Sequence, residues 1–188
     1  MGARSDAAVI AASLDDPAEF GRIFDRYATV MYRYFVRRVD TDMAQELLGE
    51  LFRIAFERRG SFDQTRTEAR PWLYGIASRL VAKHWRSEYR RLNATARLAA
   101  RSVGGPDATE PVDARLDVDA VWPHVAKAVA DLPSGERDVL VLRAWEDLSY
   151  DEIAQSLDIP VGTVRSRLNR VRRRLRDLDT TTGRQQHD

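Results

Sequence analysis

Two helical patterns separated by a short break lie between residues 149 and 176 of this 188-residue chain, and few folds accommodate such a pair. Ser149 and Glu152 have the spacing of a capping box, which opens a helix. Pro160 interrupts that helix because proline cannot continue it, and a second helix is expected from Val161. Two helices joined by a short turn predict a helix-turn-helix, whose second helix lies in the major groove of DNA.

The second helix has one narrow apolar edge, formed by Val164, Leu168, Val171 and Leu175. The rest of its surface is rich in arginine and contains no acidic residue. A surface helix that only faces solvent usually alternates Glu with Lys or Arg, and the second helix has no such pairs. We therefore favour contact with DNA over a solvated surface helix. Its arginines are Arg165, Arg167, Arg170, Arg172, Arg173, Arg174 and Arg176.

The charge of the whole chain hides this basic helix, because the formal net charge is only +1. Basic residues gather at 79–91 and in the last helix, whereas 107–119 is acidic. Hydrophobic residues make up 44% of the chain, which is enough for a core, and no long apolar alternation indicates a sheet. The composition and the helical periods together predict an all-α fold.

No residue pattern indicates catalysis or a bound metal. The chain has no cysteine, which excludes disulfides and thiolate zinc sites. Its histidines, His84, His124 and His187, lack metal-ligand spacing, and nucleotide-binding and nucleophile motifs are missing. We therefore expect a protein that is not an enzyme and holds no cofactor or metal. Because no signal peptide and no long apolar segment is visible, we expect a cytoplasmic location without membrane insertion.

Amphipathic patterns divide the chain into two small helical domains. Three helices, expected over about 17–38, 41–60 and 71–92, form the first domain, which spans 17–92. The second domain spans 119–178 and ends with the helix-turn-helix.

The remaining segments lack helical periodicity or contain helix breakers. Residues 93–118 carry alanines, then Gly and Pro, then acidic residues, which predicts a flexible acidic linker. Residues 1–16 are expected to form a flexible N-terminus, and 179–188 a disordered tail.

The third helix of the first domain carries a second basic surface. On a helical wheel, Arg79, Lys83, Arg86 and Arg90 fall on one side, opposite an apolar cluster. Trp72 projects near this basic side, where it could stack on an unpaired base. Trp72 could equally be an ordinary packed residue at the start of the helix, and the sequence favours neither role.

These features resemble bacterial RNA polymerase sigma factors of the extracytoplasmic-function (ECF) group of the sigma-70 family, which keep only the second and fourth sigma regions. The most specific match is LPSGERDVLVLRAWEDLSYDEIAQSLDIPVGTVRSRLNRVRRRL, which is similar to the fourth region. AQELLGELFRIAF at 44–56 and RPWLYGIASRLVAKHWR at 70–86 are similar to parts of the second region. The resemblance covers roughly 17–92 and 119–178, and it implies a subunit that directs promoter-specific initiation.

The resemblance implies three groups of contact residues. The helix at 44–56 would dock on the β′ clamp helices of core RNA polymerase, and the second domain would approach the β flap. Docking residues would be Glu46, Leu47, Glu50, Leu51, Phe52 and Arg53. Contacts to the melted −10 element would come from Phe62, Arg70, Trp72, Arg79, Lys83, Arg86 and Arg90. The −35 element would be read by Arg165, Ser166, Asn169 and Arg170, with Arg167, Arg172 and Arg173 holding phosphates.

The chain departs from the family pattern at three places. Gly49 stands where Gln is common, inside a helix that glycine weakens. Ser78 and Arg79 replace a frequent Arg-Asn pair, and Lys83 replaces a frequent Asp, so an unusual −10 sequence is expected. The acidic segment 107–119 could occupy the basic RNA path of the polymerase, or it could be a simple solvated spacer, and the sequence favours neither role.

Two further points stay open at the level of sequence. The alternative function is a stand-alone helix-turn-helix regulator that does not dock on polymerase, which the 44–56 helix and the Trp-led basic helix disfavour. Many members of the family are held by an anti-sigma factor, and nothing in this sequence identifies one.

Overall fold

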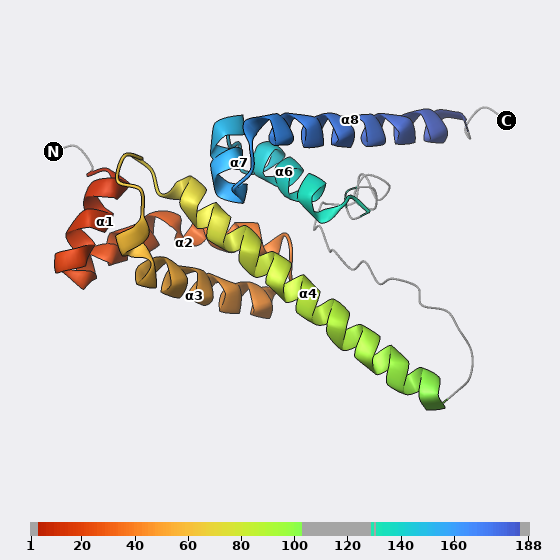
Figure 1. Cartoon of the computed structure of the whole chain (residues 1–188), viewed down its shortest axis with the longest axis horizontal. Coiled ribbons are helices and arrows are strands. Elements are labelled where there is room, and N and C mark those ends of the chain that lie inside the picture. The colour runs from red at the N-terminus through yellow and green to blue at the C-terminus, as the bar shows by residue number, and fades with distance from the viewer. Residues whose placement is uncertain (1–3, 103–128, 130, 185–188) are drawn as a thin grey trace.

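The computed structural model describes residues 4–102, 129 and 131–184, and every regular element in that part of the chain is helical. The helices fall into two groups, one from each half of the chain (Figure 1). The first group is α1 (Asp6–Asp15), η1 (Pro17–Phe20), α2 (Gly21–Val36), α3 (Thr41–Glu57), η2 (Arg59–Ser61) and α4 (Arg70–Ser102). The second group is α6 (Ser134–Ala144), α7 (Tyr150–Leu157) and α8 (Val161–Arg184).

The first group packs α2, α3 and the start of α4 around aromatic and aliphatic side chains. Tyr34, Phe35, Leu51 and Leu73 are fully buried there. α3 begins where the sequence supplies a cap, because the Asp40 side chain accepts a hydrogen bond from the Met43 amide (2.9 Å). The predicted all-α fold and the three expected helices of this half are confirmed.

The N-terminal segment differs from the prediction of a flexible 1–16, because residues 6–15 form a helix. α1 is a helix capped by Ser5, and its Val9 and Ile10 are fully buried. The Asp6 carboxylate holds the helix in place: it accepts hydrogen bonds from Tyr27, from Arg26 (2.5 Å) and from the Ala69 amide (2.8 Å). Apolar residues lie on all sides of this ten-residue helix, so its periodic signal is weak, and its stability comes from these tertiary contacts.

Two helices run further than the sequence pattern predicts. α4 continues through Ser102 instead of ending near Leu92, because the residues that follow are rich in alanine, the strongest helix former. α8 continues to Arg184, so the part of the expected tail from 179 to 184 is helical, with no proline in the sequence to stop it. The rest of the expected linker, 103–118, and the expected start of the second domain, 119–128, lie outside the described residues.

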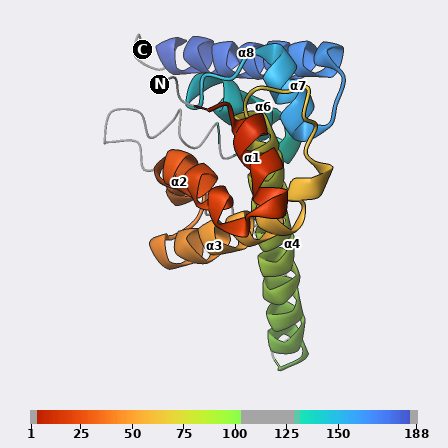
Figure 2. The same ribbon diagram turned by 90° about the vertical axis from the view of Figure 1, so that its left-hand side faces the viewer.

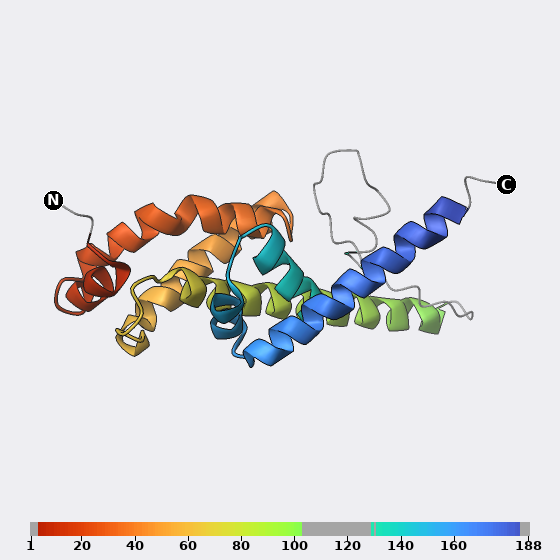
Figure 3. The ribbon, with the colours of Figure 1, turned by 90° about the horizontal axis from the view of Figure 1, so that it is seen from above.

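The two groups of helices lie directly against each other. α7 rests on α4, α6 lies beside them, and α8 crosses above α4 (Figures 2 and 3). One hydrophobic core includes Leu73 and Tyr74 of α4 together with Leu142, Leu148 and Ile153 of the second group. The sequence pattern predicts two bodies joined only by a tether, and nothing in it indicates that they pack together.

Candidate nucleic-acid interface

The helix-turn-helix is built as its sequence indicates. Ser149 Oγ accepts a hydrogen bond from the Glu152 amide (3.2 Å), and Glu152 Oε2 accepts one from the Ser149 amide (2.7 Å), which completes the capping box. Asp158 ends α7 in the left-handed conformation (φ 54°), and the Ile159 amide donates to the Ala154 carbonyl (3.0 Å). The chain then turns into α8.

The orientation of α8 follows from its apolar edge. Val164, Leu168 and Val171 are buried against α6 and α7, so the opposite side of α8 faces solvent. Most of the predicted −35 residues lie on that exposed side: Arg165, Ser166, Asn169, Arg170, Arg172 and Arg173. Arg167 is half-buried and donates to the Gly135 carbonyl of α6 (3.4 Å).

A buried carboxylate beneath α8 was not expected from the sequence. Glu136 of α6 is only 6% exposed, and its two oxygens lie 3.3 Å from Arg170 Nε and 3.4 Å from Arg174 Nε. These two arginines are therefore partly neutralised in the free protein. The sequence shows only that Glu136 lies in the helix before the helix-turn-helix, and an acidic residue there is too common to predict an ion pair with Arg170 or Arg174.

The basic row of α4 is exposed in the structure. Arg79, Lys83, Arg86 and Arg90 all face away from the core of the first helical group. Arg79 also lines a small cavity together with Arg167, between α4 and the helix-turn-helix. The row therefore lies at the edge of the contact between the two groups of helices.

Three of the predicted −10 residues contact protein in this arrangement. Phe62 is buried and packs edge-to-face against Trp72, with ring centroids 5.2 Å apart. Trp72 itself is half-buried, which matches its packed role more closely than a free stacking role. The Arg70 guanidinium donates to the backbone carbonyl of Glu146 in the second group.

Glu146 is the centre of the contact between the two groups. Its carboxylate is 6% exposed, accepts a hydrogen bond from the Tyr74 hydroxyl, and lies 3.0 Å from Arg37 Nη1. Burial and the hydrogen bond to Glu146 raise the pKa of Tyr74 well above its ordinary value. A second ion pair joins Arg38 to Asp138 at 2.7 Å.

A glycine lets the two groups approach closely. A Cβ at Gly75 would lie 2.6 Å from the Ser156 carbonyl oxygen, so α4 and α7 come this near only because residue 75 is glycine.

The predicted polymerase-docking helix, α3, presents a mixed surface. Leu47, Leu51 and Phe52 are buried and hold α3 in the core, whereas Glu46 and Arg53 are exposed. Arg53 pairs with Glu50 at 2.7 Å and with Glu57 at 2.5 Å. The hydrogen bond from Arg53 lowers the pKa of Glu50.

One exposed residue beside this helix was missed at the level of sequence. Phe24 of α2 is 45% exposed and packs on Phe52, with ring centroids 4.8 Å apart. The period of α2 places Phe24 with the core residues, and only the packing of α2 on α3 shows that its ring reaches the surface.

The described residues contain no group of His, Cys, Asp or Glu arranged to hold a metal ion. Among the described helices, none combines the length and the apolar character that a bilayer-spanning segment requires.

Comparison with known proteins agrees with this architecture. Residues 125–175 match the family model for sigma-70, region 4. The chain is 30% identical over 174 residues to the ECF RNA polymerase sigma factor SigW of Bacillus subtilis (strain 168), an alignment that covers 87% of this chain and 92% of SigW. It is 33% identical over 164 residues to the RNA polymerase sigma-H factor of Pseudomonas aeruginosa (strain PAO1), covering 84% of each chain.

Solved structures share the fold. The chain superimposes on CnrH, solved in complex with the cytosolic domain of CnrY, with a TM-score of 0.62 and 24% identity over 94% of this chain and 97% of CnrH. It superimposes on the sigma factor RpoE of Bartonella quintana, solved with the anti-sigma factor NepR, with a TM-score of 0.58 and 20% identity over 86% of this chain and 97% of RpoE. Sequence identity over nearly the whole length shows that the chain belongs to the ECF RNA polymerase sigma factors, which direct promoter recognition by the polymerase and are not enzymes.

Proposed function

We propose that the chain recognises its promoter with two separate surfaces, the exposed side of α8 for the −35 duplex and the basic row of α4 for the melted −10 strand. The observation that carries this proposal is that both surfaces are rich in exposed arginine and belong to different helical groups. Arginine pairs bidentately with guanine in the major groove, and cationic rows with aromatic neighbours bind single strands. The first group would be sigma region 2 and the second sigma region 4.

On the α8 surface the proposed readers are Arg165, Ser166, Asn169 and Arg170, near the start of the helix, where a recognition helix meets base edges. Arg172 and Arg173 lie further along the same exposed side and are proposed to hold phosphates, as is Arg167 once it leaves the Gly135 carbonyl. On α4 the proposed strand contacts are Arg79, Lys83, Arg86 and Arg90, together with Arg70, Trp72 and Phe62 at its start.

The packed arrangement of the two groups would have to open on a promoter. The −35 and −10 elements are roughly 25 base pairs apart, which is roughly 85 Å along the duplex at about 3.4 Å per base pair. α7 touches α4 here, and the 33 residues of α4 span only about 50 Å at 1.5 Å per residue. The packed form therefore fits the free protein, and the separated form fits the promoter-bound subunit.

Core RNA polymerase is the proposed agent of this opening. The exposed side of α3, with Glu46, Glu50 and Arg53, would contact the β′ clamp helices, with Leu47, Leu51 and Phe52 shaping the surface from below. The second group would be drawn to the β flap. Binding energy from two distant sites on one large partner favours the separated form, because only that form reaches both.

An anti-sigma factor is proposed as a further partner. CnrH was solved with CnrY and RpoE of Bartonella quintana with an anti-sigma factor, and this chain shares their fold. Such a partner would compete with polymerase if it favoured the packed form.

The decisive experiment compares promoter binding with and without core polymerase. Genomic run-off transcription with reconstituted holoenzyme identifies promoters, and fluorescence anisotropy then measures the affinity of the full chain and of the holoenzyme for one of them. We expect specific binding by the holoenzyme and only weak, salt-sensitive binding by the chain alone. Tight specific binding by the chain alone, together with no binding to core enzyme, would instead establish the stand-alone regulator.

A further inference from the structure

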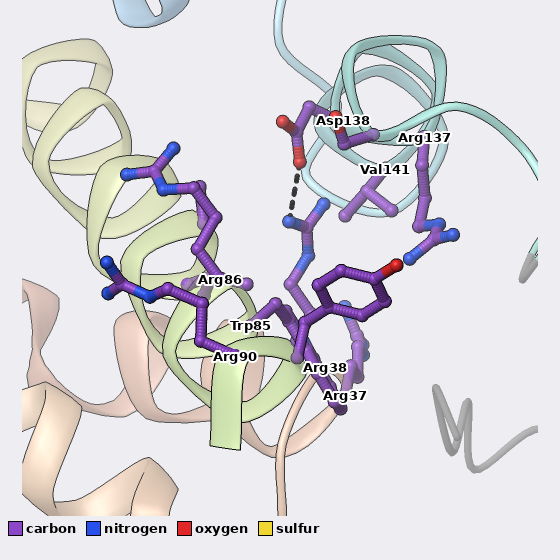
Figure 4. Close-up of a pocket in the computed structure, with 12 residues that line it drawn as sticks. Arg37, Arg38, Trp85, Arg86, Arg90, Arg137, Asp138 and Val141 are labelled. Carbon is purple, nitrogen blue, oxygen red and sulfur yellow. Dashed lines mark hydrogen bonds and ion pairs between the residues drawn. The ribbon is translucent and has the colours of Figure 1, made fainter. Parts of the chain in front are cut away.

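A cavity of about 490 Å³ lies where the end of α2, the middle of α4 and the start of α6 meet (Figure 4). Its volume is in the range of pockets that hold small organic molecules. Because α4 and α6 belong to different helical groups, the cavity exists only while the two groups are packed together. A molecule bound there would touch both groups at once.

The wall of the cavity is strongly cationic. Among the described residues, Asp138 is the one carboxylate in the lining, which also holds five arginines: Arg37, Arg38, Arg86, Arg90 and Arg137. Figure 4 shows Arg86 and Arg90 on one side and Arg38 and Arg137 on the other. Burial lowers the pKa of Arg137, the neighbouring charge of Arg38 lowers it further, and Asp138 and Asp131 act in the opposite direction. Such a wall selects an anion with several negative charges.

Arg38 has hydrogen-bonding capacity that the protein does not use. It is only 7% exposed, its Nη1 donates to Asp138, and its guanidinium lies over the ring of Tyr34. Its Nε and Nη2 have no hydrogen-bond partner among the described residues. These two nitrogens form one edge of the guanidinium, and that edge matches two oxygens of a phosphate group. A buried cation with unpaired donors gains strongly from an acceptor.

Both of these nitrogens are covered by neighbouring atoms, so a ligand must displace a side chain to reach them. Tyr89 lines the same cavity and is 53% exposed, which leaves its ring room to turn. An oxyanion would reach this edge of Arg38 only through such side-chain movement, whereas Arg86 and Arg90 are already exposed.

The same cavity offers an apolar and aromatic surface. Trp85 and Tyr89 are four residues apart and lie on one face of α4, and Val81 and Val141 complete the surface. Inorganic phosphate would leave this surface unused. A flat ring carrying a chain of phosphates would use both the aromatic surface and the arginines, because rings stack on Trp, Tyr and Arg.

We propose that the cavity binds a nucleoside polyphosphate, with the phosphates between Arg38, Arg86 and Arg90 and the base against Trp85 and Tyr89. Because the site is complete only in the packed form, the ligand stabilises that form by mass action and holds the sigma factor away from promoters. The proposal rests on the packed arrangement and not on which DNA sequence the chain reads.

The first test titrates ATP into the full chain, without DNA or polymerase, by isothermal calorimetry. Gly75→Ala places a methyl group against the Ser156 carbonyl and separates the two groups while keeping every arginine. Gly49→Ala is the matched control, because a Cβ at Gly49 meets nothing within 4 Å. We expect one ATP per chain for wild type and Gly49→Ala, and at least tenfold weaker binding for Gly75→Ala. Equal binding by all three would place ATP on the exposed DNA-binding arginines and would overturn the proposal.

The second test does not depend on opening the structure. Tyr89→Ala removes a half-exposed ring, so the helices should be retained, as circular dichroism will show. We expect its affinity for ATP to fall several-fold while its affinity for inorganic pyrophosphate stays within twofold of wild type. Unchanged ATP affinity would refute a base-binding site. If Gly75→Ala loses helical structure, this comparison alone decides the proposal.

Discussion

Gly75 of α4 packs against the backbone of Ser156 in α7 so closely that a Cβ at position 75 would lie 2.6 Å from the Ser156 carbonyl oxygen. Real Cβ atoms do not approach a carbonyl oxygen this closely, and the oxygen belongs to a helix that cannot move alone. Residue 75 thus sets how near the two helical groups can come.

The first prediction follows from that contact. Gly75→Ala should separate the two groups and leave each folded, because the added methyl group meets only the opposing group. Alanine also favours the helical state of α4 itself by about 1 kcal/mol over glycine. Small-angle scattering of the full chain should show a larger radius of gyration, and fluorophores placed on α3 and α8 should move apart.

The control for this prediction is Gly49→Ala, which changes a glycine in an exposed position of α3. It should leave the radius of gyration unchanged and raise the free energy of unfolding by about 1 kcal/mol. A Gly75→Ala variant as compact as Gly49→Ala would contradict the assigned role of Gly75.

The second prediction concerns Glu136, the carboxylate beneath α8. Glu136→Gln should release Arg170 and Arg174 from their ion pairs and make both available to DNA phosphates. Each additional phosphate contact steepens the dependence of log K on log salt by about 0.9. Anisotropy titrations of the full chain with a non-specific duplex, at several salt concentrations, measure this slope.

A suitable control is Asp151→Asn, which removes an exposed acid from the first turn of α7. Its salt slope should match that of wild type. If Glu136→Gln also shows the wild-type slope, the two arginines are not restrained by Glu136.

The third prediction is a loss of stability at alkaline pH. Burial raises the pKa of Tyr34 to about 12, and burial with hydrogen bonds to carboxylates raises the pKa values of Tyr27 and Tyr74 as well. The folded protein therefore holds these protons more tightly than the unfolded chain, where tyrosine has a pKa of about 10. Their contribution is complete below about pH 10 and is lost as the pH rises through the folded-state pKa values.

Urea denaturation between pH 8 and about pH 12 measures this decline. Tyr74→Phe should flatten part of it, because phenylalanine has no proton to lose. Tyr89→Phe, at a half-exposed ring, should follow the wild-type curve. A Tyr74→Phe curve identical to wild type would mean that the Tyr74 proton does not contribute to folding.

The fourth prediction tests the role of α1. Asp6→Asn removes the charge that Arg26, Tyr27 and the Ala69 amide share, at a carboxylate only 4% exposed. Weakening these hydrogen bonds to a charged group, in a pair whose arginine is partly exposed, should lower the free energy of unfolding by about 1.5–3 kcal/mol. Asp15→Asn, at the exposed end of the same helix, should change it by no more than about 0.5 kcal/mol. A small effect of Asp6→Asn would show that α1 is only loosely attached.

The sequence is most informative where local chemistry determines structure. The capping box at Ser149, the break at Pro160 and the apolar edge of α8 are enough to locate the helix-turn-helix and to show which side of α8 exposes its arginines. These features act within a few residues of each other, so a single sequence reveals them.

The sequence is least informative where distant segments meet. Nothing in the pattern around Asp6 shows that its carboxylate binds Arg26 and the Ala69 amide, and nothing near Glu146 indicates Tyr74 as its partner. Phe62 and Arg70 are assigned to the −10 strand by resemblance, yet in this arrangement one is buried and the other binds the Glu146 carbonyl. Such contacts depend on the packing of the two groups, which periodicity does not encode.

The hydrogen bond from Arg70 to the Glu146 carbonyl occupies a side chain that we propose to bind the −10 strand. Under that proposal, Arg70 cannot bind the strand while it binds region 4, so the strength of a few contacts between helical groups would set how readily transcription starts. Substitutions at Glu146 or Ser156, which need never meet the promoter, would then change the output of every gene that this sigma factor controls. The level of transcription from a promoter would then depend partly on protein residues that DNA does not contact.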